Sequence, residues 1–161
     1  LTYSVSMTTR SPRDKEVEGV DYYFVSREEF ERRIKNDELL EYAEFVGNYY
    51  GTPKDKIEQL RNEGHNVFLE IEINGANQVM SKVHDGRTIS FFLMPPDIKA
   101  LENRIRKRKT EPESVIQMRL QKGQKEMTMT ENYDYVILND QVVRAANEIA
   151  RLIKEKIQEN D

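Results

Sequence analysis

The sequence contains no cysteine, and it has only two histidines, seven glycines and five prolines. Without cysteine the chain forms no disulfide and has no thiolate for catalysis, and we expect a reducing compartment, the cytoplasm. The histidines, His65 and His84, lie in charged segments without metal-ligand spacing, so we expect both to be solvated and predict no metal site made of side chains. The longest apolar run, residues 89–96 interrupted by Ser90, is far too short to span a membrane, and we expect no membrane partner.

The balance of 37% hydrophobic and 34% charged residues over 161 residues is typical of a single folded domain. The net charge of −4 excludes little, but residues 99–109 carry six cations against one glutamate. Such a stretch favours an anion, either the phosphates of a small molecule or a nucleic acid. A solvated helix face explains it equally well. Because the run lacks interleaved aromatic residues, we expect no nucleic-acid partner.

Three apolar segments of strand length each end in a polar or proline-containing corner that helix-like sequence follows. They are residues 67–73, 89–94 and 135–138, and helical periodicity covers 98–105, 115–127 and 142–157. Alternating strands and helices predict an α/β fold with a parallel sheet, whose ligands bind at the carboxyl ends of the strands.

The first half predicts a small mixed α/β insertion over residues 8–53. Residues 3–6, 22–25 and 39–46 have the character of short strands, and residues 47–51 that of a turn. Ser26 opens a capping box for a helix through Phe30 and Ile34. Thr52 followed by Pro53 predicts the start of the next helix, and Gly64 its end.

Several polar side chains in these segments suit a phosphorylated ligand. Arg10 and Arg13 flank a proline, so their planar guanidinium groups can converge on one phosphate; the alternative is two exposed loop arginines. The sequence Tyr-Tyr-Gly-Thr at 49–52 gathers hydroxyl donors, or else forms a packed turn. Glu70 and Glu72 share one face of the strand predicted at 67–73, where a ligand or cation must meet them unless the strand is a solvated edge.

The sequence resembles the guanylate kinase family over essentially its whole length. The resemblance rests on Ser-Val-Ser-x-Thr-Thr-Arg-x-Pro-Arg at 4–13, Gly-x-Asp-Tyr-x-Phe at 19–24 and Gly-Asn-Tyr-Tyr-Gly-Thr at 47–52. It continues through Pro95-Pro96, the spaced pair Arg104 and Arg108 with Thr110-Glu111, and Asn139-Asp140. It implies a P-loop nucleoside monophosphate kinase-like sheet flanked by helices, with core residues 1–7, 54–96 and 124–161, a GMP-binding subdomain at 8–53 and a helical lid at 97–123. The implied reaction is ATP + GMP to ADP + GDP, with Mg²⁺ accompanying ATP.

The resemblance also implies roles for individual residues. Ser6, Arg10, Arg13, Tyr22 and Tyr50 would hold the GMP phosphate, and Glu16 would orient the loop arginines. Glu41, Thr52 and Glu72 would recognise guanine, and Glu70 would lie near the Mg²⁺-bound phosphates. The guanine assignment is chemically sound, because N1–H and the N2 amino group are donors that suit carboxylates, while O6 accepts from a hydroxyl.

On the ATP side, the resemblance implies that Arg104 and Arg108 close over the ATP phosphates and that Arg119 bridges donor and acceptor. These three arginines would be the catalytic residues, since phosphoryl transfer depends mainly on positioning and charge stabilisation. Asn139 and Asp140 would border the adenine. Lys107 and Lys109 stand where the family usually has glycines in the lid, which predicts a stiffer segment.

The larger departure is that no Gly-x-x-x-x-Gly-Lys-Ser/Thr motif occurs, since none of the seven glycines precedes a lysine. We expect that a segment of roughly thirty residues with the first strand, phosphate loop and first helix belongs before Leu1, and that the chain as written is close to inactive. A guanylate-kinase-like module that binds phosphopeptides is the main alternative, and a kinase for another nucleotide is a weaker one. The lid arginines, Arg104 and Arg108, and Asn139-Asp140 favour the enzyme over the phosphopeptide-binding module, because only ATP binding requires them.

Overall fold

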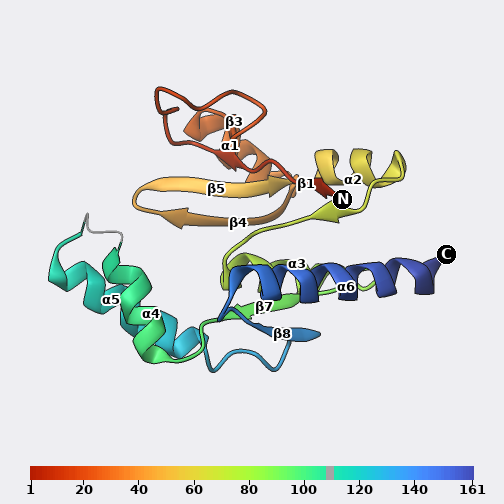
Figure 1. Cartoon of the computed structure of the whole chain (residues 1–161). Coiled ribbons are helices and arrows are strands. Elements are labelled where there is room, and N and C mark those ends of the chain that lie inside the picture. Colours follow the sequence, from red (N-terminus) through yellow and green to blue (C-terminus); the bar gives the residue numbers. More distant parts are fainter. Residues whose placement is uncertain (108–110) are drawn as a thin grey trace. The chain divides into compact units, whose positions relative to one another are not determined.

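The chain divides into two units, Leu1–His84 and Asp85–Asp161. The computed structural model describes residues 1–107 and 111–161. Each unit has its own strands and helices, which Figure 1 labels. The predicted α/β fold with parallel strand pairs and flanking helices is confirmed.

Unit 1 contains two sheets. Its elements in chain order are β1 (Thr2–Tyr3), β2 (Met7–Thr8), β3 (Tyr23–Phe24), α1 (Arg27–Lys35), β4 (Leu39–Phe45), β5 (Asn48–Pro53), α2 (Lys54–Asn62), β6 (Val67–Phe68) and α3 (Ile73–Lys82). Strands β1 and β6 form a parallel pair. The other sheet has the order β3-β2-β5-β4; β2 is parallel to β3 and antiparallel to β5, which is antiparallel to β4. This four-stranded sheet, together with the loop that joins β2 to β3, carries most of the residues to which the sequence assigns GMP binding.

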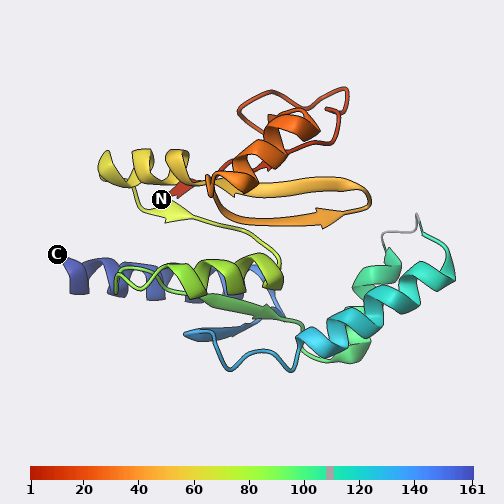
Figure 2. The ribbon, with the colours of Figure 1, turned by 180° about the vertical axis from the view of Figure 1, so that it is seen from behind.

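Helix α1 covers the four-stranded sheet, as Figures 1 and 2 show from opposite sides. Phe30 on this helix is completely buried in a cluster with Met7 and Leu39. Its ring stacks on that of Tyr49 with the centroids 4.9 Å apart. Burying such a ring stabilises a fold by about 1.5–3 kcal/mol, so α1 anchors the sheet from which the site is built.

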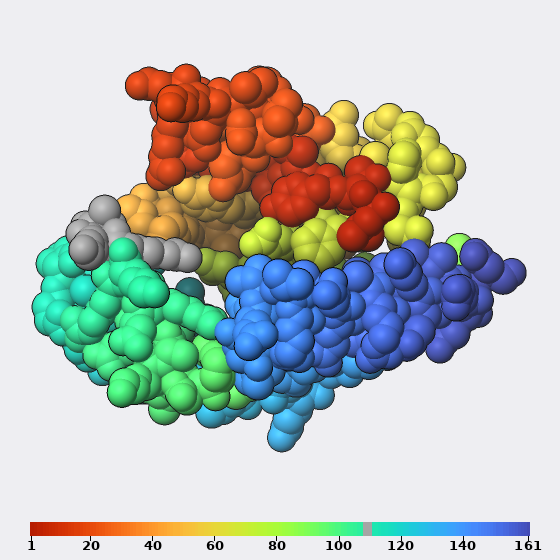
Figure 3. Space-filling model, in the orientation of Figure 1, coloured from red at the N-terminus to blue at the C-terminus, as the bar shows by residue number. Residues whose placement is uncertain are grey.

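Unit 2 combines a parallel strand pair with three helices. Its elements are β7 (Phe91–Met94), α4 (Ile98–Lys107), α5 (Glu113–Glu126), β8 (Tyr135–Leu138) and α6 (Val142–Asn160). Phe91 lies opposite Tyr135, and Met94 lies opposite Leu138. Ile137 packs against α6, which forms a continuous surface of this unit in the space-filling view (blue in Figure 3). Among the described residues, no helix is both long and apolar enough to cross a membrane.

Several local predictions are confirmed. The Ser26 side chain accepts a hydrogen bond from the backbone N–H of Glu29 over 3.1 Å and caps α1. Helix α2 ends just before Gly64, whose φ of 84° is the left-handed conformation that glycine adopts most easily. Helices α4, α5 and α6 and strand β8 occupy the segments that the apolar periodicity indicated.

The predicted strand at 67–73 is wrong in its extent. Only Val67 and Phe68 form a strand, because β1 offers just two partner residues and ends at Tyr3. Residues 69–72 belong to no strand, so the prediction that Glu70 and Glu72 share a strand face is wrong. Ile73 begins α3.

The predicted start of α2 is also wrong. Thr52 belongs to β5, paired with Glu41, and Pro53 occupies the N-cap position before Lys54. The Thr52 hydroxyl donates across the sheet instead of capping the helix. The turn predicted at 47–51 shrinks to Val46 and Gly47, both with positive φ, which is the geometry of a two-residue hairpin.

Three other strands are shorter or displaced. The strand predicted at 3–6 is replaced by β1 and β2, which leave Ser4 to Ser6 outside regular structure, and β3 covers only Tyr23–Phe24. Strand β7 begins at Phe91 rather than Ile89. In each case the apolar run is longer than the neighbouring strand that pairs with it.

Candidate functional site

The loop between β2 and β3 is held by an ion pair between Arg10 and Glu16. Nη1 of Arg10 lies 2.8 Å from Oε1 of Glu16, and Nη2 lies 2.8 Å from Oε2, which is the bidentate geometry of a strong charge-assisted pair. The backbone N–H of Arg13 donates to the same Oε1 over 2.8 Å. Arg10, followed by this N–H, lowers the pKa of Glu16 to about 2. The carboxylate is therefore ionised at neutral pH and ties both arginine positions together.

Two tyrosines lie beside Arg10. Its Cζ is 5.4 Å from the centroid of the Tyr22 ring, and the Tyr22 and Tyr50 rings meet edge to face with centroids 6.1 Å apart. Glu16 is the main cause, and a hydrogen bond with Tyr50 a further cause, of a raised pKa for Arg10. A permanent cation and two phenol groups thus lie together, and guanidinium and phenol N–H and O–H groups are donors that suit phosphate.

A buried carboxylate and hydroxyl lie on the neighbouring strands. Glu41 on β4 is 6% exposed and Thr52 on β5 is 0% exposed. The Thr52 hydroxyl donates to Oε1 of Glu41 over 2.7 Å. Burial raises the pKa of Glu41, the Thr52 hydrogen bond opposes that rise, and nearby Glu72 adds to it. This pair presents one acceptor group and one hydroxyl, the two kinds of group that guanine requires.

Strand β5 connects the two clusters. Tyr50 and Thr52 are two residues apart on this strand, so their side chains project from the same face. The Tyr50 ring meets the ring of Tyr22, beside which Arg10 lies, and Thr52 donates to Glu41. The spacing of about 6–7 Å along a strand separates a phosphate-type subsite from a base-type subsite.

A cavity of about 340 Å³ opens beside Glu16 and Tyr22, the two partners of Arg10, in unit 1. Its lining includes four residues that the sequence singled out and three that it did not: Ser6, Glu16, Tyr22 and Glu70, with Tyr3, Val20 and Asp21. The loop over residues 9–21 that borders it stands at the surface of unit 1 (red-orange in Figure 3). The cavity is thus bordered on one side by hydroxyl groups that suit phosphate, those of Ser6 and Tyr22, and on the other by Glu70, which follows β6.

Tyr3 is a lining residue that sequence reasoning missed. Burial is the main cause of its raised pKa, and Glu70, to which it is hydrogen-bonded, contributes to the rise. Pairing of β1 with β6 places Tyr3 beside Phe68, two residues before Glu70. The signal available in the sequence was the strand character of Tyr3, but nothing local indicated that β6 would be its partner.

Unit 2 carries the residues to which the sequence assigns ATP binding. Nη2 of Arg104 on α4 donates to the backbone oxygen of Asn139 over 2.5 Å, so these two predicted residues lie together. Nε of Arg144 lies 2.7 Å from Oδ1 of Asp140, and Arg144 is the main cause of the lowered pKa of that carboxyl. Arg144 was not predicted; it lies in the first turn of α6, four residues after Asp140, which precedes that helix.

Arg119 on α5 pairs with Glu111 at 2.6 Å. Arg106, another residue that was not predicted, donates to both carboxylate oxygens of Glu113 over 2.8 Å and so links α4 to α5. Arg108 and Lys109 lie outside the described residues, so the predictions that fall on them are not addressed by the structure. The role of Lys107, at the end of α4, stays a prediction.

The part of the chain that the structure describes contains no group of three or more histidine, cysteine, aspartate or glutamate side chains able to hold a metal ion. Mg²⁺ that accompanies a nucleotide is held largely by phosphate oxygens and water, with one or two carboxylates from the protein. The Glu70 carboxylate on the cavity wall is a ligand of the right type for such a contact with Mg²⁺.

Comparison with known proteins places the chain among the nucleoside monophosphate kinases. The family model described as guanylate kinase matches residues 1–156, and the chain belongs to the guanylate kinase family. The guanylate kinase of Latilactobacillus sakei subsp. sakei is 52% identical over 152 residues, which are 94% of this chain and 74% of that protein. The guanylate kinase of Mesoplasma florum is 52% identical over 162 residues; it matches 100% of this chain, which spans only 54% of its length.

A solved structure gives the same result for the fold. The crystal structure of guanylate kinase from Anaplasma phagocytophilum superposes with a TM-score of 0.77 at 36% identity, and the match covers 96% of this chain and 75% of that one. The resemblance stated from the sequence motifs is therefore confirmed at the level of family and fold. The subdomain bounds and the roles of individual residues stay predictions.

Proposed function

We propose that this chain carries the GMP site and part of the ATP site of a guanylate kinase that transfers the γ-phosphoryl group of ATP to GMP, giving ADP and GDP. The observation that carries the proposal is the arrangement along β5. Tyr50, whose ring meets that of Tyr22 beside Arg10, and Thr52, which donates to Glu41, project from one face of that strand. A monophosphate group and a guanine base need these two kinds of group side by side.

The phosphate end is supported by charge. Arg10 stays cationic at all physiological pH values, and Glu16 holds its guanidinium in a fixed plane. Arg13 follows on the same loop and is exposed, so its guanidinium can reach a ligand. Ser6 and Tyr22 line the adjoining cavity and add hydroxyl donors.

The base end implies an exchange of hydrogen bonds. Thr52 has a single O–H, and it donates to Glu41 in the structure. When the Thr52 hydroxyl turns to guanine O6, Glu41 loses that donor, and its two carboxylate oxygens accept from guanine N1–H and the N2 amino group instead. Glu72, whose charge acts on Glu41, supplies the second carboxylate. Adenine lacks this donor pattern, so it would leave buried carboxylate oxygens without partners.

For the donor nucleotide we propose ATP with Mg²⁺, and we assign Arg104, Arg108 and Arg119 to its phosphates and Asn139 and Asp140 to the adenine. Mg²⁺ bridging the β- and γ-phosphates would neutralise charge that develops during transfer. Arg104 and Arg119 would add fixed positive charge once they leave Asn139 and Glu111. A cytoplasmic location remains a prediction from the lack of cysteine.

Titration calorimetry with the 161-residue chain tests the acceptor assignment. GMP should bind more tightly than AMP, because only guanine satisfies the carboxylates, and more tightly than guanosine, because only GMP engages Arg10 and Arg13. A variant that exchanges a surface arginine of unit 2 to which no ligand role is assigned, Arg151→Lys, should keep both preferences. Equal binding of GMP, AMP and guanosine, or tight binding of phosphopeptides with none of GMP, would reject the proposal.

A further inference from the structure

The carboxyl group of Glu41 lies directly against the first turn of helix α3, at Gly75. A methyl group placed on Gly75 would lie 2.5 Å from Oε2 of Glu41 and 3.0 Å from its Cδ. Ordinary contacts between carbon and oxygen are about 3.3–3.6 Å long, so any residue with a side chain would collide with the carboxylate. Gly75 is buried and has a helical backbone, which any residue can adopt. Glycine is therefore needed here because a side chain would not fit, and not because of the backbone conformation.

The carboxylate has little room to retreat. Its Oε1 accepts from Thr52 over 2.7 Å on the side of β5, while Oε2 faces Gly75. Only 6% of Glu41 and none of Thr52 is exposed, so the surroundings are packed. A side chain at residue 75 would therefore either rotate the Glu41 carboxylate and distort its hydrogen bond with Thr52, or force it against neighbouring atoms.

Helix α3 is also fixed. The Gln78 side-chain amide donates to the backbone oxygen of Tyr42 over 2.8 Å and accepts from the Tyr42 N–H over 3.1 Å, so it imitates a strand partner on the edge of β4. Nζ of Lys82 donates to the backbone oxygen of Leu40 over 3.1 Å. Gly75, Gln78 and Lys82 are spaced by three and four residues, so they form one helix face that meets β4 around Glu41.

We propose that Gly75 is a positioning residue that sets guanine specificity, by allowing α3 to pack against the carboxylate of Glu41 and hold it opposite the base. This inference rests on the proposed role of Glu41 in reading guanine. Gly75 acts through Glu41 and touches no nucleotide itself. Gln78 and Lys82 hold α3 so close to β4 that residue 75 has no room for a side chain.

The proposal differs from a purely structural role for Gly75 in what it predicts for ligand discrimination. Inosine monophosphate has the phosphate and O6 of GMP but lacks the N2 amino group, so it offers the carboxylates one donor instead of two. A displaced Glu41 should cost GMP more than inosine monophosphate. General loosening of unit 1 would weaken both ligands alike.

The experiment is calorimetry of the 161-residue chain with both ligands, for the wild type, Gly75→Ala, Glu41→Gln and the double variant. We expect Gly75→Ala to reduce GMP affinity about tenfold or more and to lower the preference for GMP over inosine monophosphate. In the Glu41→Gln background, Gly75→Ala should change that preference little further, because the group through which it acts is already lost. Gly123→Ala is the matched control: a methyl there would lie 2.7 Å from the flexible end of Leu101, in unit 2.

The outcomes separate the two proposals. If the wild type binds GMP no better than guanosine or AMP, the proposed function fails. If the wild type prefers GMP and Gly75→Ala keeps the full preference, or lowers it by the same factor with and without the Glu41 carboxylate, the positioning role of Gly75 fails. Thermal unfolding followed by circular dichroism shows whether each variant folds. If Gly75→Ala does not fold, the pair Gln78→Ala and Lys82→Ala, which releases α3 from β4, provides the same comparison.

Discussion

The predicted GMP residues of unit 1 and the predicted ATP residues of unit 2 differ in what their polar groups contact. In unit 1 the contacts join predicted site residues to one another, as in the pairs Arg10–Glu16 and Thr52–Glu41. In unit 2, Arg104 donates to a backbone oxygen and Arg119 pairs with Glu111, to which the sequence assigned no role. Burial differs as well, since Glu41 is 6% exposed and the Arg119 side chain 36% exposed.

This difference indicates that the proposed acceptor site is preorganised, whereas the arginines proposed to bind the donor nucleotide must exchange partners. A preorganised site loses little conformational entropy when its ligand binds, whereas exposed arginines must leave existing contacts before they can hold phosphates. The first kind of site should bind its ligand alone, and the second should depend on further groups that hold ATP.

The largest expected effect concerns turnover. A protein consisting of Leu1–Asp161 should bind GMP but release ADP more than about 1000-fold more slowly than the same protein with an added segment that carries a Gly-x-x-x-x-Gly-Lys-Ser/Thr motif, because backbone donors aimed at transferring phosphates contribute factors of that size. A coupled ADP-release assay on both proteins measures the ratio. Turnover of the shorter protein at about 1–1000 per second would show that the donor site needs no such loop.

A smaller effect separates the two nucleotides. Glu72→Gln should weaken GMP binding by about 1–3 kcal/mol, since a hydrogen bond from guanine to a charged carboxylate is lost, and should leave ATP binding unchanged. Calorimetry with each nucleotide measures this difference, and Glu63→Gln on the exposed segment after α2 is the control. Equal losses for both nucleotides would mean that Glu72 supports the fold instead of reading the base.

The phosphate clamp gives the third effect. Arg10→Lys should weaken GMP several-fold, because lysine keeps the charge but lacks the planar fork that Glu16 holds in place. Guanosine, which has no phosphate, should bind equally to the wild type and the variant. A loss of guanosine binding of the same size would assign Arg10 to loop structure and not to the phosphate.

Local signals in the sequence predicted most of the helices, and the family motifs named residues that the structure brings together, such as Arg10 and Glu16, but neither indicated the long-range pairing of strands. The Ser26 cap and the end of α2 near Gly64 depend on neighbours within four residues, so the residues themselves specify them. The length of β6 depends on β1, more than sixty residues earlier, and the apolar alternation through Ile73 gave no sign that its partner would end. The contact of Glu41 with Gly75 could not be predicted for the same reason, because no local pattern around either residue indicates that the two segments pack together.

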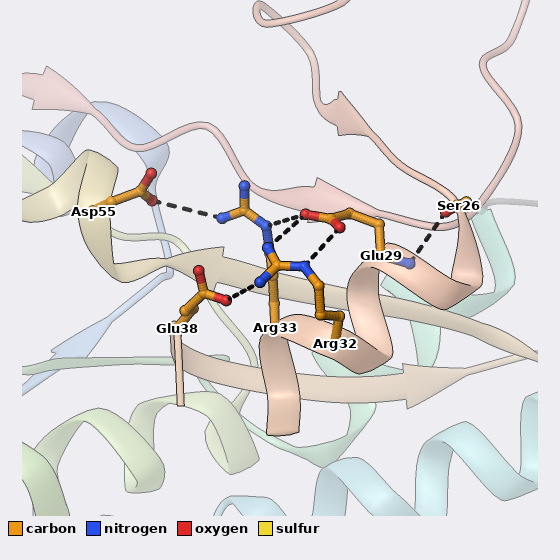
Figure 4. A network of polar contacts seen from close by, with 6 residues as sticks. All are labelled: Ser26, Glu29, Arg32, Arg33, Glu38 and Asp55. Carbon is orange, nitrogen blue, oxygen red and sulfur yellow. Dashed lines mark hydrogen bonds and ion pairs between the residues drawn. The ribbon is translucent and has the colours of Figure 1, made fainter. Parts of the chain in front are cut away.

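The smallest expected effect concerns acid stability and a network on α1 that lies apart from the proposed ligand groups. Figure 4 shows Glu29 held by Arg32 and Arg33, with Arg32 reaching Glu38 and Arg33 reaching Asp55. Arg32 first, and Arg33 second, lower the pKa of Glu29 to about 2 from an ordinary value of 4.5. A carboxyl whose pKa is lowered by folding stabilises the folded state above its unfolded pKa, and that contribution is lost as the pH falls from about 4.5 to about 2.

Glu29→Gln should therefore reduce stability slightly at neutral pH and flatten the dependence of unfolding on pH between about 4.5 and 2. Glu28→Gln is a close control, because Glu28 also lies in the first turn of α1 and meets the same helix dipole. Urea unfolding at a series of pH values distinguishes the two variants. Since Ser26 caps the same turn through the backbone of residue 29, the substitution leaves that hydrogen bond intact, and any difference from Glu28→Gln belongs to the arginine contacts. Identical pH profiles for Glu28→Gln and Glu29→Gln would show that the network adds no more than the helix dipole does.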